Sequence, residues 1–126
     1  MENKNISSRE FTSYDFSENL LKGVADAGYQ FLTKVQEITF EQSLTGKDVT
    51  VMSQTGTGKT AAFLISIFSQ MVNGEKVTEA ERKQVKKALI LSPTRELAIQ
   101  IEKEAKLLGS HLGLLIGSFY GGVGYN

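Results

Sequence analysis

The sequence contains no cysteine and one histidine, and these absences exclude several kinds of site. Without cysteine there is no disulfide and no thiolate metal site, and a single histidine cannot form a histidine metal cluster. We expect His111 to lie at the surface or at a strand edge. The 14 basic and 14 acidic residues give a formal charge of zero. No global positive field therefore predicts a nucleic-acid partner, although local contacts remain open.

Long hydrophobic runs are also absent. No segment reaches transmembrane length, and the N-terminus has no apolar signal core. We therefore expect a soluble, cytoplasmic protein with no membrane partner. With 126 residues the chain holds one domain at most, and an apolar fraction of 40% is enough for a core.

Predicted helices and strands alternate along the chain. Helices are expected between Ser17 and Gly28, between Thr33 and Gly46, over 59–72 and over 94–108, where capping residues and periodic apolar positions coincide. Strands are expected at 48–52 and 88–91 and within 112–119, residues 1–10 as a frayed end, and 75–87 as a solvated, mobile and partly helical connection. This order predicts an α/β fold with a parallel sheet, flanking helices and right-handed crossovers.

The most informative segment is Ser-Gln-Thr-Gly-Thr-Gly-Lys-Thr at residues 53–60, which follows a predicted strand and opens an apolar helix. Glycines let successive backbone N–H groups surround an anion, and the helix N-terminus adds further donors and a positive dipole end. In such a loop the lysine reaches the β- and γ-phosphates and the threonine hydroxyl ligates Mg²⁺. The predicted ATP site comprises Ser53, Gln54, Thr55, Gly56, Thr57, Gly58, Lys59 and Thr60, of which Lys59 and Thr60 serve catalysis and Thr60 binds the metal.

The loop departs from the strict G-x-x-x-x-G-K-[ST] pattern at its first position, where Ser53 replaces glycine. A small residue can still suffice there. The alternative is a chance Gly-Lys-Thr in an ordinary loop. The strand before it and the helix after it favour the phosphate-binding interpretation.

A second block, Ser-Pro-Thr-Arg-Glu-Leu-Ala at 92–98, lies between a predicted strand and its helix. Together with residues 53–60 it resembles motifs Ia and I of the DEAD-box RNA helicase family, which belongs to superfamily two and has RecA-like domains. Gly121-Gly122 is similar to the GG motif of that family, and residues 28–36 are similar to its Q motif. Phe11, 17 positions before Gly28, matches the isolated aromatic residue upstream of the Q motif.

Two departures from the family pattern stand out. Leu32 occupies the place where the Q motif usually has proline. The sequence also contains no D-E-A-D, no S-A-T and no second RecA-like domain, which in the family supply the metal-side acid, the water-activating glutamate and the arginine fingers. The resemblance therefore implies an N-terminal portion of the first RecA-like domain over 11–126, unable to hydrolyse ATP alone. An exposed sheet edge that allows self-association is also expected.

The resemblance assigns roles around the base. Gln36 is expected to read adenine, since a side-chain amide matches the donor and acceptor of the N6/N7 edge. From spacing alone, Thr33 and Gln36 equally fit a helix capping box, and the two roles are compatible. Phe11 is expected to stack on the base, with a core position beside Tyr14 and Phe16 as the alternative.

The remaining motifs are expected to hold an RNA backbone without sequence preference. These residues are Pro93, Thr94, Arg95, Gly121 and Gly122. The alternative for Arg95 is a surface ion pair with Glu102 or near Glu96.

The sequence thus favours the ATP-binding part of an ATP-dependent RNA helicase that uses Mg²⁺. Two other classes compete with this interpretation. One is a P-loop NTPase that does not bind RNA, and the other is a non-catalytic nucleotide- or RNA-binding module.

Overall fold

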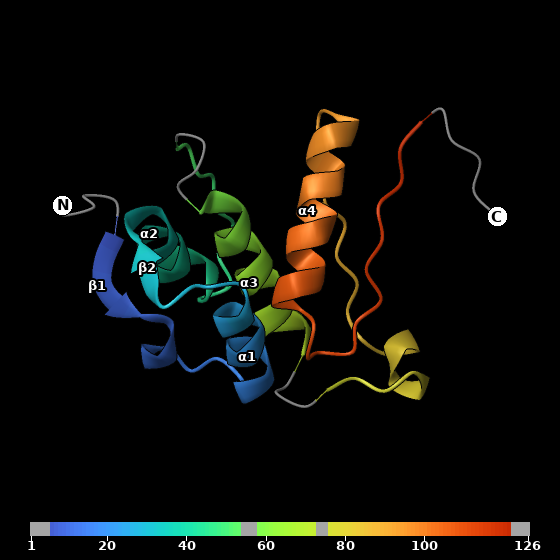
Figure 1. The fold of residues 1–126 in the computed structure, drawn as a ribbon, viewed down its shortest axis with the longest axis horizontal. Coiled ribbons are helices and arrows are strands. Elements are labelled where there is room, and N and C mark those ends of the chain that lie inside the picture. Colours follow the sequence, from blue (N-terminus) through green and yellow to red (C-terminus); the bar gives the residue numbers. More distant parts are fainter. Residues whose placement is uncertain (1–5, 54–57, 73–75, 122–126) are drawn as a thin grey trace.

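The computed structural model describes residues 6–53, 58–72 and 76–121. Its elements are β1 (Ile6–Glu10), the short 3-10 turn η1 (Phe11–Ser13), α1 (Glu18–Asp26), β2 (Phe31–Thr33), α2 (Lys34–Ser43), α3 (Lys59–Met71), the 3-10 turn η2 (Ala80–Lys83) and α4 (Arg95–Leu108) (Figure 1). Within these ranges no helix has the length and apolar character needed to cross a bilayer.

The four helices begin and end where the sequence predicts. Ser17, Thr33 and Thr94 each accept a backbone N–H of the first helical turn, over 3.1, 3.2 and 3.1 Å respectively. Such a cap stabilises a helix by about 0.5–2 kcal/mol. Beyond α1 and α2 the chain turns at Gly28 and Gly46, whose φ angles of 87° and 83° favour glycine.

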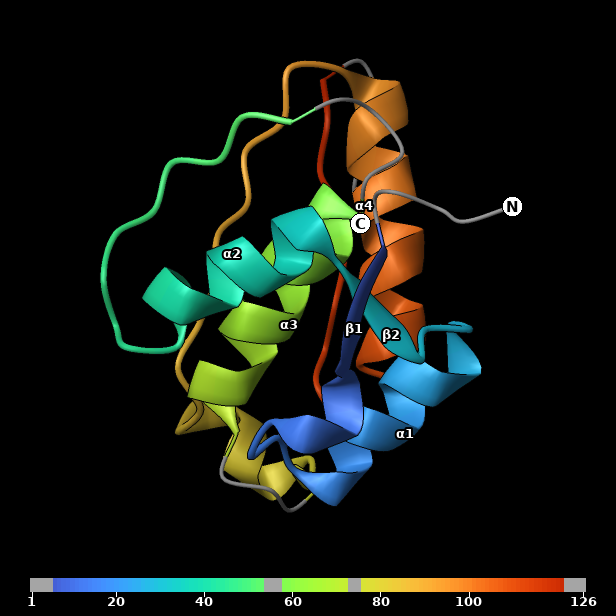
Figure 2. The ribbon, with the colours of Figure 1, turned by 90° about the vertical axis from the view of Figure 1, so that its left-hand side faces the viewer.

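The prediction of a frayed N-terminus is wrong for residues 6–10. This segment forms β1, which pairs antiparallel with β2 through Ile6 opposite Thr33 and Glu10 opposite Phe31 (Figure 2). Its side chains are mostly exposed, so the segment lacks the alternation of apolar and polar residues that predicts a strand. Backbone pairing with a segment more than 20 residues away stabilises it, and a local sequence pattern does not report such pairing.

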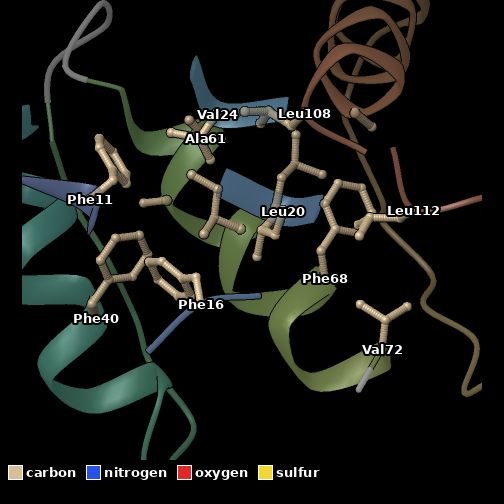
Figure 3. Packing of buried hydrophobic residues seen from close by; sticks show 14 of the residues in the cluster. Phe11, Phe16, Leu20, Val24, Phe40, Ala61, Phe68, Val72, Leu108 and Leu112 are labelled. Carbon is tan, nitrogen blue, oxygen red and sulfur yellow. The ribbon is translucent and has the colours of Figure 1, made fainter. Parts of the chain in front are cut away.

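The core lies around α3, which is buried on more than one side, as its apolar composition predicts. Five of its apolar side chains are nearly inaccessible: Ala61, Ala62, Leu64, Ile65 and Phe68. Figure 3 shows Phe11, Phe16 and Phe40 facing one another on one flank of α3, with Leu108 and Leu112 on the other. The helix that follows the predicted phosphate loop is thereby fixed against α2 and α4.

The three predicted parallel strands are not formed in the described residues. Segments 48–52, 88–91 and 112–119 are extended for most of their length but carry no strand pairing there. The second and third of these segments border an apolar groove of about 590 Å³ beside α4. The groove is lined there by residues 85–92 and 114–119. Strands pair only at a spacing of about 4.7–4.9 Å. These segments line the groove without pairing across it in the described residues, and Leu89, Leu91 and Leu115 remain about 85% exposed.

The connection over 76–87 is mostly exposed and partly helical, as predicted. It is nevertheless tied to the turn after α4. Val77 N–H donates to the Leu112 carbonyl over 2.7 Å, and the Arg82 side chain donates to the Gly113 carbonyl over 2.9 Å. The segment is therefore held against the turn after α4 by these two bonds to backbone carbonyls and by the side chain of Val77, which is buried in the core.

Helices α1 and α4 approach each other closely at Gly23. A Cβ at this position would overlap the Leu108 carbonyl oxygen and lie 2.7 Å from its carbon. One turn further along α1, Asp26 pairs with His111 over 2.6 Å. His111 is therefore a surface residue, as expected, and it joins two helices that are distant in sequence.

Candidate nucleotide-binding site

The N-terminus of α3 has the backbone geometry of an anion site. Gly58 is its N-cap with φ 78° and ψ 19°, and no side chain caps the helix. The first intrahelical bond shown is from Ala62 N–H to the Gly58 carbonyl, at 3.0 Å. The preceding N–H groups have no intrahelical acceptor, so they and the helix dipole favour a negative group.

Lys59 and Thr60 stand in the first turn of α3, and both are half-buried. The Lys59 ammonium lies 3.4 Å from the Ser53 carbonyl oxygen, which is a long and weak hydrogen bond. Little stabilisation is lost if the ammonium turns to a phosphate. Four predicted site residues, Gln54, Thr55, Gly56 and Thr57, lie outside the described residues.

Among the described residues of the predicted site, Thr60 is the candidate ligand for a Mg²⁺ ion. The hydroxyl of Thr60 fits an ion that retains most of its waters and is bound chiefly through substrate phosphates. In the described part of the chain no group of three or more histidine and acidic side chains could hold a metal. The donor set therefore suits Mg²⁺ held together with a nucleotide rather than a separate metal centre.

Gln36 is fully buried and connects two predicted motifs. Its Oε1 accepts the Thr33 N–H over 2.9 Å while Thr33 Oγ1 accepts the Gln36 N–H, so the capping box is confirmed. Its Nε2 also donates to the Gly58 carbonyl over 3.1 Å. Sequence reasoning missed this bond because it spans 22 residues. It ties the segment expected at the base to the loop expected at the phosphates.

The amide of Gln36 retains capacity for a ligand. An amide offers two N–H donors and two carbonyl lone pairs, and one of each is used here. Because the side chain is fully buried, a base reaches the remaining groups only after neighbouring side chains move. A Cβ at Gly58 would overlap Gln36 Nε2, so glycine at 58 is needed for this contact as well as for its positive φ.

Phe11 does not have the position that stacking on a base requires. Its side chain is 2% exposed, and its ring centroid lies 5.9 Å from Tyr29 and 6.2 Å from Phe40. Phe11 thus has the core position of the alternative, and stacking on a base, for which the ring would have to leave this position, stays a prediction. A hollow of about 350 Å³ borders Phe11, but Gln36 does not line it. Packing of the Phe11 ring against the aromatic side chains next to α2 stabilises the buried position relative to an exposed one.

Leu32, which replaces the usual proline, is fully buried in β2. Proline would fix the entry to α2 through its ring. Here burial of Leu32 and the capping box at Thr33 hold that entry, with Thr33 at φ −76° and ψ 161°. The loop before α2 is therefore fixed by other means.

The second predicted cluster lies at the N-terminus of α4, where Pro93, Thr94 and Arg95 are exposed. Arg95 donates to the Gly121 carbonyl over 2.9 Å, and its guanidinium carbon lies 5.0 Å from the centroid of the Tyr120 ring. The structure thus brings the 93–95 and 121 segments together. Gly122 lies outside the described residues. Sequence reasoning missed Tyr120, although an aromatic residue next to a paired glycine was visible.

The ion-pair alternative for Arg95 is wrong. Glu102 instead accepts from Ser118 over 2.7 Å and pairs with Lys106 over 3.1 Å. These two partners hold the pKa of the Glu102 carboxyl below its usual value. Within the described residues Arg95 is shown donating one hydrogen bond, to Gly121, and a guanidinium has five N–H donors that suit phosphate oxygens.

Comparison with known proteins points to one family. The profile of the DEAD/DEAH box helicase family matches residues 33–126. The chain is 38% identical to the ATP-dependent RNA helicase RhlB of Shewanella frigidimarina over 125 residues, covering 99% of this chain and 29% of the relative. It is 42% identical to RhlB of Xanthomonas oryzae over 127 residues, covering 100% of this chain and 22% of the relative.

A solved structure extends the likeness to the fold. The RNA helicase Prp28 of Chaetomium thermophilum bound to ADP matches with a TM-score of 0.73 and 32% identity, over 97% of this chain and 31% of that one. The predicted fold class, an α/β RecA-like helicase domain present in part, is confirmed by this match. The chain spans less than a third of the length of each of these three proteins.

Proposed function

Because the chain belongs to the DEAD/DEAH box helicase family, we propose that it is the ATP-binding part of an ATP-dependent RNA helicase. Residues 11–126 would form the N-terminal portion of its first RecA-like domain. The observation that carries the proposal is the hydrogen bond from Gln36 to the Gly58 carbonyl. This bond supports the proposal because it joins Gln36, the residue expected to read adenine, to the N-cap of α3, where phosphates are expected.

In this proposal each end of the nucleotide has its own residues. Gln36 reads the adenine edge, and loop 53–58 surrounds the phosphates with backbone N–H groups. Lys59 neutralises phosphate charge, and Thr60 supplies one ligand to Mg²⁺. The named activity of the RhlB relatives and the ADP in the Prp28 structure support this assignment.

The RNA side of the proposal rests on the exposed cluster at α4. Pro93, Thr94 and Arg95 lie there together with Gly121, and Gly122 follows directly in the sequence. Arginine donors and helix N-terminal N–H groups suit phosphate oxygens and carry no sequence information. RNA would therefore bind through its backbone without sequence preference.

We expect residues 1–126 alone to bind nucleotide without turning it over. Phosphoryl transfer requires a second metal anchor, a positioned water and further positive charge. Segments 88–91 and 112–119 contain no aspartate or glutamate that could provide that anchor. These groups, and the arginine finger of a second RecA-like domain, would have to come from elsewhere in a whole helicase.

Gln36→Ala should abolish most of the preference for ADP over GDP. Two hydrogen bonds to the base, each contributing about 0.5–1.5 kcal/mol, correspond to a preference of roughly fivefold to a hundredfold. Calorimetric titration of both nucleotides measures it. Thr33→Ala is the matched control, because it removes the helix cap but leaves the amide of Gln36 in place. If Gln36→Ala keeps the preference, Gln36 does not read adenine.

Arg95→Ala in the full-length protein tests the helicase assignment. It should raise the RNA concentration needed for half-maximal stimulation of phosphate release at least about tenfold, because a charge-assisted contact to a phosphate is lost. Lys103→Ala removes an exposed charge from the same helix and should have little effect. Phosphate release that RNA does not stimulate in the unmutated protein would instead favour an NTPase that does not act on RNA.

A further inference from the structure

One hydrogen bond that the sequence does not predict joins the Q-motif segment, residues 28–36, to α4. The Tyr29 hydroxyl donates to Glu104 Oε1 over 2.9 Å, across 75 positions of sequence. Tyr29 directly follows Gly28, where the chain leaves α1, and precedes β2 and the Thr33–Gln36 capping box. The bond therefore holds the start of the segment whose far end presents Gln36.

The side chain of Tyr29 is suited to this bond. Its ring packs against Phe11 at 5.9 Å between centroids, and its hydroxyl emerges at the carboxylate. Burial and the Glu104 contact raise the pKa of Tyr29 to about 12, so at neutral pH the phenol is protonated and remains a donor. A hydrogen bond from a neutral donor to a carboxylate is among the stronger ones in proteins.

Helix α4, to which Tyr29 is bonded, is itself held in place at both ends. Thr94 caps its first turn, Arg95 is bound to Gly121, and Leu108 near its end is fully buried. Gly23 of α1 meets the carbonyl of that same Leu108. The segment that begins at Gly28 thus starts close to the point where α1 packs against α4. The bond from Tyr29 to Glu104 attaches this segment to α4 as well.

We propose that Tyr29 and Glu104 are positioning residues that set the choice of base by fixing the Gly28–Thr33 segment, and with it Gln36, against α4. The inference rests on the proposed function, since it assumes that Gln36 reads adenine. Tyr29 acts through the backbone of residues 30–33. Thr33 at the end of that stretch donates its N–H to Gln36 Oε1 over 2.9 Å. Without the hydrogen bond between Tyr29 and Glu104, residues 28–33 sample more positions and the side-chain amide of Gln36 loses its fixed orientation.

The test compares base preference with phosphate binding in the 126-residue chain. ADP, GDP and pyrophosphate are titrated calorimetrically into the unmutated chain, Tyr29→Phe, Glu104→Ala and Glu104→Gln. Tyr29→Phe and Glu104→Ala should each lower the ratio of ADP to GDP affinity about three- to tenfold and leave pyrophosphate affinity unchanged. Glu104→Gln keeps an acceptor oxygen and should retain most of the preference.

A matched control separates this bond from helix packing in general. Asp26→Asn weakens a different polar contact nearby, the one that joins α1 to His111 in the turn after α4, and should leave the ADP to GDP ratio unchanged. An unaltered ratio in Tyr29→Phe would overturn the inference. So would equal losses for all three ligands together with a lower melting temperature, since that marks a structural role only. Equal affinity for ADP and GDP in the unmutated chain would refute the adenine site itself, and the inference with it.

Discussion

Lys59→Ala should lower the affinity of this chain for ADP by about ten- to a hundredfold. A charge-assisted contact contributes about 1.5–3 kcal/mol, and each 1.4 kcal/mol is a factor of ten. The only hydrogen bond shown for the ammonium in the described residues is the 3.4 Å contact to the Ser53 carbonyl, so its removal should affect the ligand rather than the fold. Calorimetric titration measures the affinity, and urea denaturation checks that stability is retained.

The control for this result is Lys22→Ala. It removes the same charge from the exposed surface of α1, where Lys22 makes only a 3.9 Å contact with Glu18. Its ADP affinity should equal that of the unmutated chain. If Lys59→Ala binds ADP as well as the unmutated chain does, the N-terminus of α3 is not the phosphate site.

Gly23→Ala should destabilise the fold by about 1–3 kcal/mol, the usual cost of overpacking. Helix propensity alone favours alanine over glycine by roughly 1 kcal/mol, so an open site would give the opposite sign. Here the added methyl meets the Leu108 backbone, which cannot move without shifting α4. The midpoint of urea denaturation, followed by circular dichroism, reports the change.

Gly117→Ala is the matched comparison for Gly23→Ala. A Cβ at 117 meets nothing within 4 Å, and Gly117 is not among the glycines with positive φ. This variant should be neutral or slightly stabilised, because alanine restricts the unfolded chain. A Gly23→Ala chain as stable as Gly117→Ala would show that α1 and α4 do not pack closely at this point.

Local signals explain which parts of the structure the sequence could predict. The starts of α1, α2 and α4 each depend on a side chain that bonds to a backbone N–H three residues away, as Ser17, Thr33 and Thr94 do. The position of Lys59 and Thr60 at the first turn of α3 follows from the same local order of glycine, lysine and apolar helix. Helix caps and the phosphate-binding loop depend on residues that are close in sequence, so both can be recognised without a structure.

Long-range packing explains what the sequence could not predict. The position of Phe11 depends on where α2 and Tyr29 lie, so the local sequence, with Tyr14 and Phe16 nearby, offered a core position only as an alternative. The bond from Gln36 to Gly58 and the pairing of β1 with β2 have the same origin. The apolar runs at 88–91 and 112–119 are predicted as strands from the local sequence but do not pair as strands in the described residues. Their composition favours strands, but pairing requires a neighbouring strand at the right spacing, and both instead line a groove beside α4.

Calorimetric titration of the unmutated 126-residue chain with ADP and GDP, in parallel and with Mg²⁺ present, tests the account most directly. Gln36, the residue proposed to read adenine, is bonded to Gly58 at the proposed phosphate site, so ADP should bind more tightly than GDP once neighbouring side chains move to admit the base. Binding of both nucleotides with equal affinity, or of neither, would contradict the assignment of this chain as an adenine-nucleotide site.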